Sequence, residues 1–371
     1  MSEKSRAWAE INLEHLKHNV AQLRRLVPAS CRLMPAVKAD AYGHGMLQIL
    51  DTLTQLGIQD YCVACIDEGI RLRQAGIIGQ ILVLGYTYPA RFGDLQTYRL
   101  TQTVVDAEYA RELQRFGGCF RVHVGIDTGM HRLGAHYEEM ESICEICSYP
   151  ALNVQGIFSH LCVPDSSEES DRAFTVEQIK RFEQVTAGLH RQGIQGFARH
   201  LQGSYGMLNY PWLQYDYCRP GIILYGLLSR EDDWVQSDVS LLPVLELKTR
   251  VQSVRMVGKG EGVGYGLAFR AKEDTRIAAL SIGYADGVPR EIAGKGYVLI
   301  RGQKAPIISR LCMDQMLVDV SKVSDVRQGD EAVLIGSSGQ ERISGEQFAA
   351  WCDTITNEVF SRLGSRLERV V

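Results

Sequence analysis

No stretch of this 371-residue chain is apolar over the roughly 18 residues that a membrane-spanning helix requires. The first eight residues, Met1–Trp8, lack the apolar core of an export signal. Lysine and arginine (40) are outnumbered by aspartate and glutamate (44) and form no basic block, which argues against a nucleic-acid partner. The chain also has no internal repeat and no low-complexity tract. A composition of 45% hydrophobic and 23% charged residues is typical of a globular protein of two or three domains.

The ten cysteines lack the spacing of a metal site. Two pairs are separated by two residues, Cys62/Cys65 and Cys144/Cys147, but a zinc ribbon has its pairs much closer together in sequence. Cys62 and Cys65 lie in a strand-like run, where residues three apart face opposite ways. We therefore predict free thiols, no metal ion and a reducing compartment, the cytoplasm.

The most informative stretch is Ala36–Gly45, with the sequence AVKADAYGHG, which follows a short apolar run that predicts a buried strand. Lys38 stands where that strand ends, and a buried lysine is costly unless it is paired or bonded. Forming a neutral imine with an aldehyde cofactor such as pyridoxal phosphate removes this cost. Tyr42 and the glycines after it would let a phenol and the backbone approach a phosphate. The alternative is a lysine whose amine reaches solvent from the strand end.

Short apolar runs alternate with helical or helix-permitting stretches through the first two thirds of the chain, which predicts a parallel sheet. Eight such runs predict a (β/α)8 barrel of the TIM type, whose working residues follow the carboxyl ends of its strands. Besides the strand before Lys38, the runs are Tyr61–Ile66, Gln80–Gly85, Thr101–Asp106, Phe120–Asp127, Leu152–Ser159, Arg199–Leu201 and Tyr215–Cys218. The sequence therefore predicts an α/β domain at residues 1–235.

A polar linker at Ser229–Ser240 precedes a change of pattern, in which β-rich runs alternate with glycine and charged turns. These runs are Val244–Val257, Arg276–Ile282, Tyr297–Ile300, Ala305–Ile308, Met316–Val320 and Glu331–Ile335. Two short helices are expected near the end, at Glu346–Cys352 and Thr356–Leu363. Residues 236–371 are therefore predicted to form a second, mostly β domain.

The lysine stretch resembles the cofactor-lysine motif of bacterial alanine racemases, and further motifs of that family follow in order over nearly the whole chain. They are Trp8–Leu13 (WAEINL), Asp127–Gly134 (DTGMHRLG), Arg219–Gly226 (RPGIILYG), Gly264–Gly266 (GYG), Gly283–Gly287 (GYADG) and Cys312–Gln315 (CMDQ). The resemblance implies a racemase that uses pyridoxal 5′-phosphate and acts on a small amino acid. It assigns the two catalytic acid/bases to Lys38, which also carries the cofactor, and to Tyr265 of a partner subunit. It thus implies a homodimer with shared sites.

The resemblance also assigns binding roles to other residues. Arg219 would face the cofactor's ring nitrogen and, because arginine keeps its proton, leave that nitrogen neutral. His160 would link Arg219 to the catalytic tyrosine. The phosphate contacts would be Tyr42, Ser204, Gly221 and Ile222, and the substrate site would contain Arg132, Met313 and Asp314. Tyr284, Asp286 and Arg290 match residues near the entrance of the site or supporting it, with a purely structural role as the alternative.

The sequence departs from the family pattern at two places. Gly125 stands where alanine racemases commonly carry a lysine, often carbamylated, that orients the substrate arginine. Asn357 stands where a tyrosine usually packs beside the substrate methyl group. An asparagine offers both donors and an acceptor, and a polar partner can favour a substrate hydroxyl. With an asparagine at this position, the chain resembles the serine racemases of the vancomycin-resistance type. These are membrane proteins whose cytoplasmic part looks like alanine racemase.

We therefore expect a racemase of serine and alanine that supplies D-amino acids for peptidoglycan precursors in vancomycin resistance. The chain would be a cytoplasmic protein or the cytoplasmic domain of a longer membrane protein. Two alternatives remain open, a housekeeping alanine racemase and a cofactor-binding barrel without catalysis. A decarboxylase of the same barrel class is disfavoured, because Tyr265 and Arg132 match racemase positions.

Overall fold

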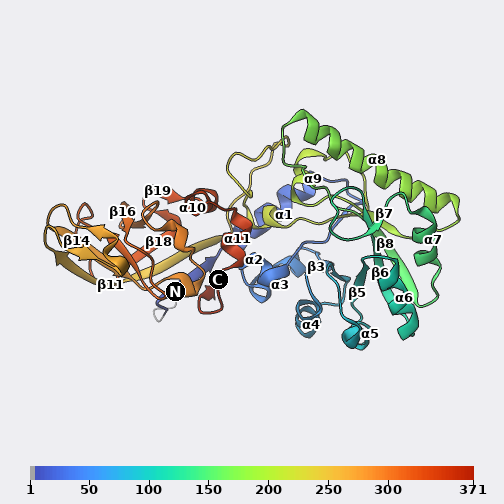
Figure 1. The fold of residues 1–371 in the computed structure, drawn as a ribbon, viewed down its shortest axis with the longest axis horizontal. Coiled ribbons are helices and arrows are strands. Elements are labelled where there is room, and N and C mark those ends of the chain that lie inside the picture. The colour runs from blue at the N-terminus through green and yellow to red at the C-terminus, as the bar shows by residue number, and fades with distance from the viewer. Residues whose placement is uncertain (1–4) are drawn as a thin grey trace.

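Eight short parallel strands form the centre of the N-terminal lobe in the computed structural model, which describes residues 5–371 (Figure 1). They are β2 (Arg32–Leu33), β3 (Tyr61–Val63), β4 (Ile81–Val83), β5 (Thr101–Val104), β6 (Phe120–Asp127), β8 (Leu152–Phe158), β9 (Ala198–His200) and β10 (Tyr217–Cys218). Their order is β2-β10-β9-β8-β6-β5-β4-β3. A parallel bridge between Ala36, just after β2, and Cys62 of β3 joins the two ends. The predicted (β/α)8 barrel is confirmed.

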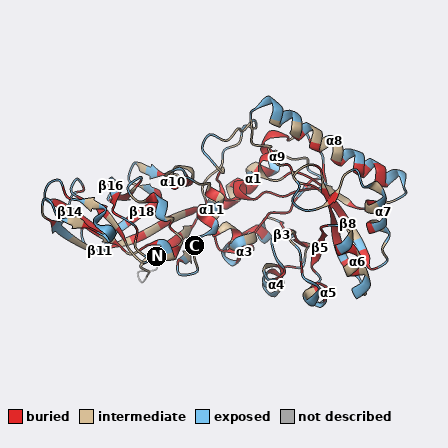
Figure 2. Ribbon diagram, in the orientation of Figure 1, coloured by how far each residue is buried: buried red, intermediate tan, exposed pale blue. Residues whose placement is uncertain are grey.

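Helices follow the strands because apolar residues three and four positions apart give each helix one face to bury against the sheet. The helices of this lobe are α1 (Leu13–Arg25), α2 (Lys38–Tyr42), α3 (Met46–Gln55), α4 (Ile66–Gln74), α5 (Phe92–Thr97), α6 (Ala107–Phe116), α7 (Met140–Ser148), α8 (Glu169–Arg191) and α9 (Ser204–Asn209). In α1 the buried face includes Leu16, Val20 and Leu23, and the Asn12 side chain caps the first turn by accepting from the His15 N–H. Figure 2 shows buried residues along the strands and exposed ones on the outer side of α8.

The C-terminal lobe is a mostly antiparallel sheet with two short helices, as predicted. Its strands are β11 (Leu245–Val257), β14 (Thr275–Leu280), β15 (Tyr297–Ile300), β16 (Gln303–Ile308), β17 (Met316–Asp319), β18 (Glu331–Ser338), β19 (Glu341–Ile343) and β20 (Glu368–Val370), beside a small hairpin of β12 (Gly262–Val263) and β13 (Phe269–Arg270). An additional pairing of β18 with β11 curls the sheet back on itself. Helices α10 (Gly345–Trp351) and α11 (Thr356–Ser361) lie where helices were expected.

The first strand of the chain, β1 (Ala7–Ile11), belongs to the second lobe. It pairs antiparallel with β11, from Ala7 opposite Thr249 to Ile11 opposite Leu245, and parallel with β20. The predicted boundary placed all of residues 1–235 in the barrel domain, and in this segment the structure departs from it. The chain thus crosses between the lobes at Asn12 and again in the irregular segment 226–244. Residues 1–4, which include part of the segment expected to lack an export signal, lie outside the described residues.

No helix in residues 5–371 is both long and apolar enough to cross a membrane. The two lobes meet near α2 and α11, which lie side by side at the junction (Figure 1). This junction brings the C-terminal end of the chain to the rim of the barrel, beside the predicted cofactor lysine.

Candidate active site

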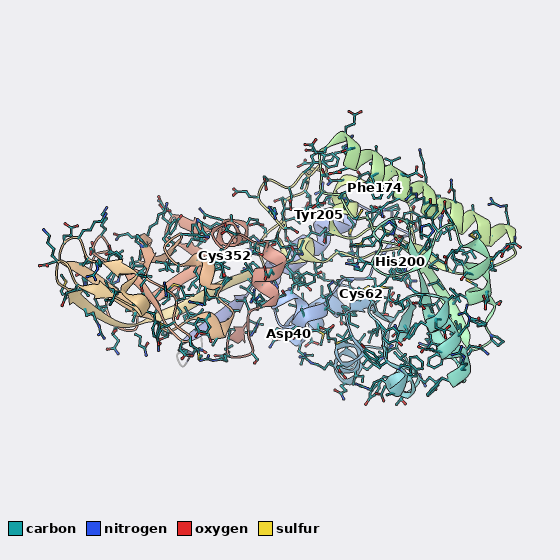
Figure 3. The ribbon with its side chains drawn as sticks, viewed as in Figure 1. Asp40, Cys62, Phe174, His200, Tyr205 and Cys352 are labelled. Atoms are coloured by element: carbon teal, nitrogen blue, oxygen red, sulfur yellow. The ribbon has the colours of Figure 1, made fainter. Side chains whose placement is uncertain are left out.

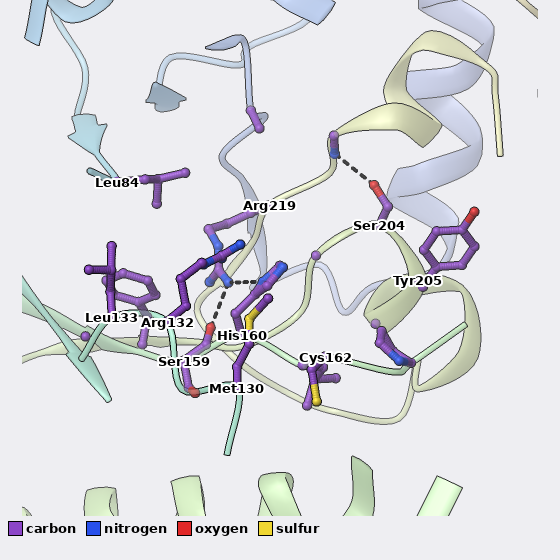
Figure 4. Close-up of a pocket in the computed structure, with 18 of the residues that line it drawn as sticks. Leu84, Met130, Arg132, Leu133, Ser159, His160, Cys162, Ser204, Tyr205 and Arg219 are labelled. Atoms are coloured by element: carbon purple, nitrogen blue, oxygen red, sulfur yellow. Dashed lines mark hydrogen bonds between the residues drawn. The ribbon is translucent and has the colours of Figure 1, made fainter. Parts of the chain in front are cut away.

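Loops at the carboxyl ends of the barrel strands enclose a cavity of about 490 Å³ (Figure 4). This is the end of the fold at which such barrels carry their ligand sites. Most of the predicted site residues line it: Lys38, Tyr42, Arg132, His160, Ser204, Arg219, Gly221, Ile222 and Asn357. The barrel brings all of them together except Asn357, which comes from α11 of the C-terminal lobe.

The chain turns sharply at Lys38. Residues Ala39 to Tyr42 all have a positive φ, between 51° and 58°, so α2 is a left-handed turn built from residues with side chains. Such a conformation costs roughly 1–2 kcal/mol per residue and persists only when its surroundings hold it. Glu68 accepts from the Ala39 N–H at 2.6 Å, and the buried His44 ring contacts the Ala41 and Tyr42 carbonyls through Nδ1 at 3.0 and 2.9 Å. The turn sets the direction in which Lys38 and Tyr42 enter the cavity.

The Lys38 amine sits in an environment that disfavours its charge. Burial lowers the pKa of Lys38, and the nearby Arg132 guanidinium lowers it further. Its Nζ lies 6.0 Å from the centre of the Tyr42 ring. Since only the neutral amine attacks an aldehyde, a lowered pKa favours imine formation.

Tyr42, Ser204 and Gly221 form a cradle in which an anion can be bound by neutral donors. The Gly221 N–H donates to Ser204 Oγ at 3.0 Å (Figure 4). A Cβ at Gly221 would lie 2.7 Å from Tyr42 Oη, so only glycine lets the backbone approach so closely. Burial raises the pKa of Tyr42 to about 12, which keeps its hydroxyl protonated as a donor. Phosphate oxygens fit such a cradle.

Substituting Gly221 by alanine is expected to weaken binding of pyridoxal phosphate by about tenfold or more, because overpacking a filled site costs typically 1–3 kcal/mol. The binding constant is measured by titrating the cofactor-free protein and following the cofactor's visible absorption. Gly93→Ala, in α5, is the matched control, since a Cβ there meets nothing within 4 Å. Equal affinities for the two variants would mean that the cradle does not receive the phosphate.

Arg219 is a buried cation without a carboxylate partner among residues 5–371, and its side chain is bonded to neutral acceptors. It donates to Ser159 O at 2.8 Å, to His160 Nδ1 at 3.3 Å and to His200 Nδ1 at 2.6 Å. Burial, with the Arg219 charge as the next cause, lowers the pKa of His160 to about 3. His160 is therefore a neutral acceptor, and its proton resides on Nε2 because arginine can only donate.

Three predicted residues lie away from the cavity, in the C-terminal lobe. Tyr265 is 67% exposed and Met313 52% exposed. Asp314 pairs with Arg366 at 2.7 Å. A single chain therefore does not bring the two predicted acid/bases together.

The residues expected near the entrance also lie in this lobe. Tyr284 is partly exposed, with the Arg290 guanidinium 5.8 Å from its ring centre. Asp286 is fully buried, pairs with Arg6 and accepts from the Gly283 N–H at 3.0 Å. In this chain Asp286 therefore holds its own lobe together.

The two departures from the family pattern both line the cavity. A Cβ at Gly125 would make only ordinary van der Waals contacts, at 3.4 Å or more, so the backbone here would accept a side chain without a clash. Within residues 5–371, Arg132 has no hydrogen bond or ion pair with another side chain. Asn357, on α11, accepts from Ser229 Oγ at 2.8 Å.

Sequence reasoning missed several side chains that contact the predicted residues. Ser229 lies in the linker and Tyr205 beside Ser204, and no pattern distinguished either of them. His200 ends the buried strand β9, and a histidine at the end of a buried barrel strand was a usable signal. Figure 3 labels Tyr205 and His200 in the barrel lobe.

The chain matches the family profiles "Alanine racemase, N-terminal domain" over residues 11–229 and "Alanine racemase, C-terminal domain" over residues 244–371. It belongs to the alanine racemase family. An alanine racemase of Halothermothrix orenii is 38% identical, covering 98% of this chain and 96% of that protein. The solved alanine racemase of Clostridium difficile 630 superposes with a TM-score of 0.91 at 33% identity, covering 99% of this chain and 95% of that one.

Two enterococcal relatives of this chain are longer. An amino-acid racemase of Enterococcus faecalis is 42% identical over 99% of this chain and 52% of that protein. A serine/alanine racemase of Enterococcus gallinarum is 39% identical over 98% of this chain and 51% of that protein. This chain spans about half the length of these relatives.

Alanine racemases depend on pyridoxal 5′-phosphate. The residues of this cavity fit that cofactor. In one cavity the chain presents an amine of lowered pKa, a cradle at Gly221 that a Cβ would fill, and a buried arginine. Lys38 would hold the aldehyde carbon, Tyr42 and Ser204 the phosphate, and Arg219 the ring nitrogen.

Proposed function

We propose that this chain is a pyridoxal-phosphate-dependent racemase that interconverts the enantiomers of serine and of alanine. The main support is the composition of the cavity, which joins an amine that can bind the cofactor, an anion cradle and a polar group at Asn357. Racemisation removes the Cα proton from one face and returns a proton to the other face. The bound cofactor supplies the conjugated ring that makes the Cα proton acidic.

Lys38 acts as the acid/base on one face of the substrate, and Tyr265 of a second copy acts on the other. Exposure of Tyr265, Leu267 and Met313 on the C-terminal lobe supports this arrangement, since a second copy would cover them. A two-fold dimer makes two equal sites, each from one barrel and one β lobe. The active form is thus a homodimer.

Arg132 and Arg219 set the charge of the site. Arg132, which has no ion pair in residues 5–371, binds the substrate carboxylate. Because residue 125 is a glycine, no carbamylated lysine at that position orients Arg132. Arg219 would hold the cofactor's ring nitrogen and, since arginine cannot give up its proton, would leave that nitrogen neutral. A neutral ring nitrogen would stabilise negative charge at Cα less strongly, which would limit side reactions.

The preference for a hydroxylated substrate rests on a hydrogen-bonded group around Asn357. The Ser229 hydroxyl donates to Asn357 Oδ1 at 2.8 Å, and the Ser229 N–H donates to Tyr205 Oη at 2.6 Å. Tyr205 in turn donates to the Asp233 carboxylate. In residues 5–371 the Asn357 Nδ2 group has no acceptor, so its two donors are available to a substrate hydroxyl. The serine/alanine racemase of Enterococcus gallinarum, as a relative, agrees with this preference.

Substituting Asn357 by tyrosine is expected to shift the serine-to-alanine ratio of kcat/KM by about 10–100-fold toward alanine, because the donors are lost and the pocket is smaller. The ratio is measured by chiral chromatography of both reactions. Asn153→Tyr, at an exposed position on β8, is the matched control and should leave the ratio unchanged. An unchanged ratio in the Asn357 variant would remove Asn357 from substrate selection.

Racemisation of L-serine and L-alanine by the purified chain with added cofactor tests the function itself. Turnover of alanine alone would indicate a housekeeping alanine racemase. Absence of both reactions despite bound cofactor would indicate a cofactor-binding protein without catalysis. D-Serine or D-alanine made in this way would supply peptidoglycan precursors, with a role in vancomycin resistance. All ten cysteines are unpaired, which suits a reducing compartment such as the cytoplasm.

A further inference from the structure

The centre of the barrel contains a chain of polar side chains where such barrels normally pack branched apolar residues. His123 of β6 and His200 of β9 are both fully buried there. Figure 3 labels His200 among the barrel strands. Two buried imidazoles cost free energy relative to an apolar layer unless every polar atom is bonded.

These side chains form a continuous line of hydrogen bonds away from Arg219. Arg219 Nη1 lies 2.6 Å from His200 Nδ1, and His200 Nε2 lies 2.8 Å from His123 Nδ1. His123 Nε2 lies 3.0 Å from the amide of Gln80, which is itself 3.0 Å from the amide of Gln155. Gln80 directly precedes β4 and Arg219 directly follows β10, so the line runs from one end of the barrel to the other.

The guanidinium fixes the direction of every bond in this line. Arginine only donates, so His200 must accept at Nδ1 and carry its proton on Nε2. His123 must then accept at Nδ1 and also carry its proton on Nε2. The Gln80 oxygen must then accept from His123 Nε2, and the Gln155 amide must turn with it, so that its NH₂ donates to the same oxygen. All the dipoles therefore point their negative ends at Arg219, which stabilises a cation buried without a carboxylate.

Neighbouring residues pack closely around the rings of His123 and His200. A Cβ at Gly156 of β8 would lie 2.6 Å from His123 Nδ1, so the glycine makes room for the ring. Phe158 stacks on His200 with ring centres 4.9 Å apart, and the Arg219 guanidinium lies 5.2 Å from the Phe158 ring centre. Burial lowers the pKa of His123 to about 3 and that of His200 well below its usual range, with the Arg219 charge as the next cause for both. Both rings thus stay neutral and act as fixed dipoles.

We propose that His123, acting through His200, is a positioning residue that holds the Arg219 guanidinium against the cofactor's ring nitrogen. This inference rests on the proposed function for the placement of Arg219. Without the acceptor at His123, the His200 N–H is left unbonded, its ring is free to turn, and Arg219 loses its shortest hydrogen bond. The ring nitrogen would then be held less firmly in its neutral form. Half-transamination, in which the substrate is oxidised to a 2-oxo acid as the cofactor aldehyde is reduced to an amine, would compete better with racemisation.

The experiment compares His123→Leu with His123→Asn in the cofactor-loaded protein. Leucine removes the acceptor, whereas the asparagine oxygen replaces Nδ1 in nearly the same place. We expect the leucine variant to release about tenfold more 2-oxo acid per racemisation event, at an unchanged KM, and the asparagine variant to return most of the way to wild type. Equal ratios in wild type and the leucine variant, or equal ratios in the two variants, would overturn the proposal.

A second measurement is independent of both activity and the stability of the variants. Ring ¹⁵N NMR of the wild-type protein should show His123 and His200 neutral with the proton on Nε2. A His200 protonated on Nδ1 would contradict the proposal, because Arg219 could not then donate to it. If the protein racemised neither amino acid, the proposed function would be wrong. The tautomers of His123 and His200 would still show whether the hydrogen-bonded line exists.

Discussion

Substituting Lys38 by alanine is expected to reduce racemisation of both amino acids by about 10³-fold or more, because one side chain supplies both the cofactor bond and an acid/base. The amine enters the cavity at the start of the left-handed turn of α2, with its pKa lowered by burial. Among residues 5–371, no other lysine lines the cavity. Rates are measured at saturating cofactor, so that weaker cofactor binding does not by itself account for the loss. The visible absorption of the cofactor bound to lysine should also disappear.

The matched control is Lys17→Ala, which removes an exposed amine that pairs with Glu14 on α1. An exposed pair of this kind contributes little to stability, so this variant should keep wild-type rates. A Lys38 variant that retained more than about a tenth of the wild-type rate would show that the chemistry does not depend on this amine.

Mixing two inactive variants, Lys38→Ala and Tyr265→Phe, is expected to restore activity if the site is shared between subunits. Tyr265→Phe alone should lose about 10²–10⁴-fold in racemisation and Lys38→Ala about 10³-fold or more, since each variant lacks one acid/base. After subunits exchange at random, half of the dimers are mixed, and each mixed dimer contains one site with both Lys38 and Tyr265. Activity should therefore rise to about a quarter of the wild-type value. It is measured after co-incubation under conditions that let dimers dissociate.

The double variant carrying both substitutions in one chain is the control for this mixing experiment. Mixed with wild type, it also forms hybrid dimers, but neither site in such a hybrid is intact. Activity should therefore fall, because only the wild-type dimers that remain after random exchange are active. If Lys38→Ala and Tyr265→Phe do not complement each other although hybrid dimers form, Tyr265 acts within its own chain or not at all. The 67% exposure of Tyr265 and its place in the C-terminal lobe make an action within one chain difficult.

The barrel could be predicted from the sequence because its strands are short, buried and regularly spaced. Periodic patterns of this kind are local, and the rule that ligand sites follow the strand ends then groups residues that are distant in sequence. The place of strand β1 in the second lobe was not predicted in this way. Its five residues resemble any short strand, and its pairing partners in β11 and β20 lie more than 200 residues away.

The left-handed turn after Lys38 was not predictable from its residues, because alanine, aspartate and tyrosine all disfavour a positive φ. It exists because Glu68, on α4, accepts from its first N–H and because the ring of His44, two residues beyond the turn, is buried against its last carbonyls. The same holds for Ser229 and Asn357, which are 128 residues apart and meet only because α11 packs at the rim of the barrel.

By itself, the sequence determined the two-lobed architecture, the cofactor lysine motif, the family to which the chain is similar and the two positions at which it departs. Each of these is encoded in local periodicity or in residues that stand in fixed order. Tertiary structure alone decided which side chains share the cavity, the strain at Lys38, the separation of Tyr265 from it and the direction of the hydrogen bonds behind Arg219. The reason is physical: burial, pKa shifts and tautomers depend on what surrounds a group in space, and those surroundings come from strands and loops that the sequence does not place side by side.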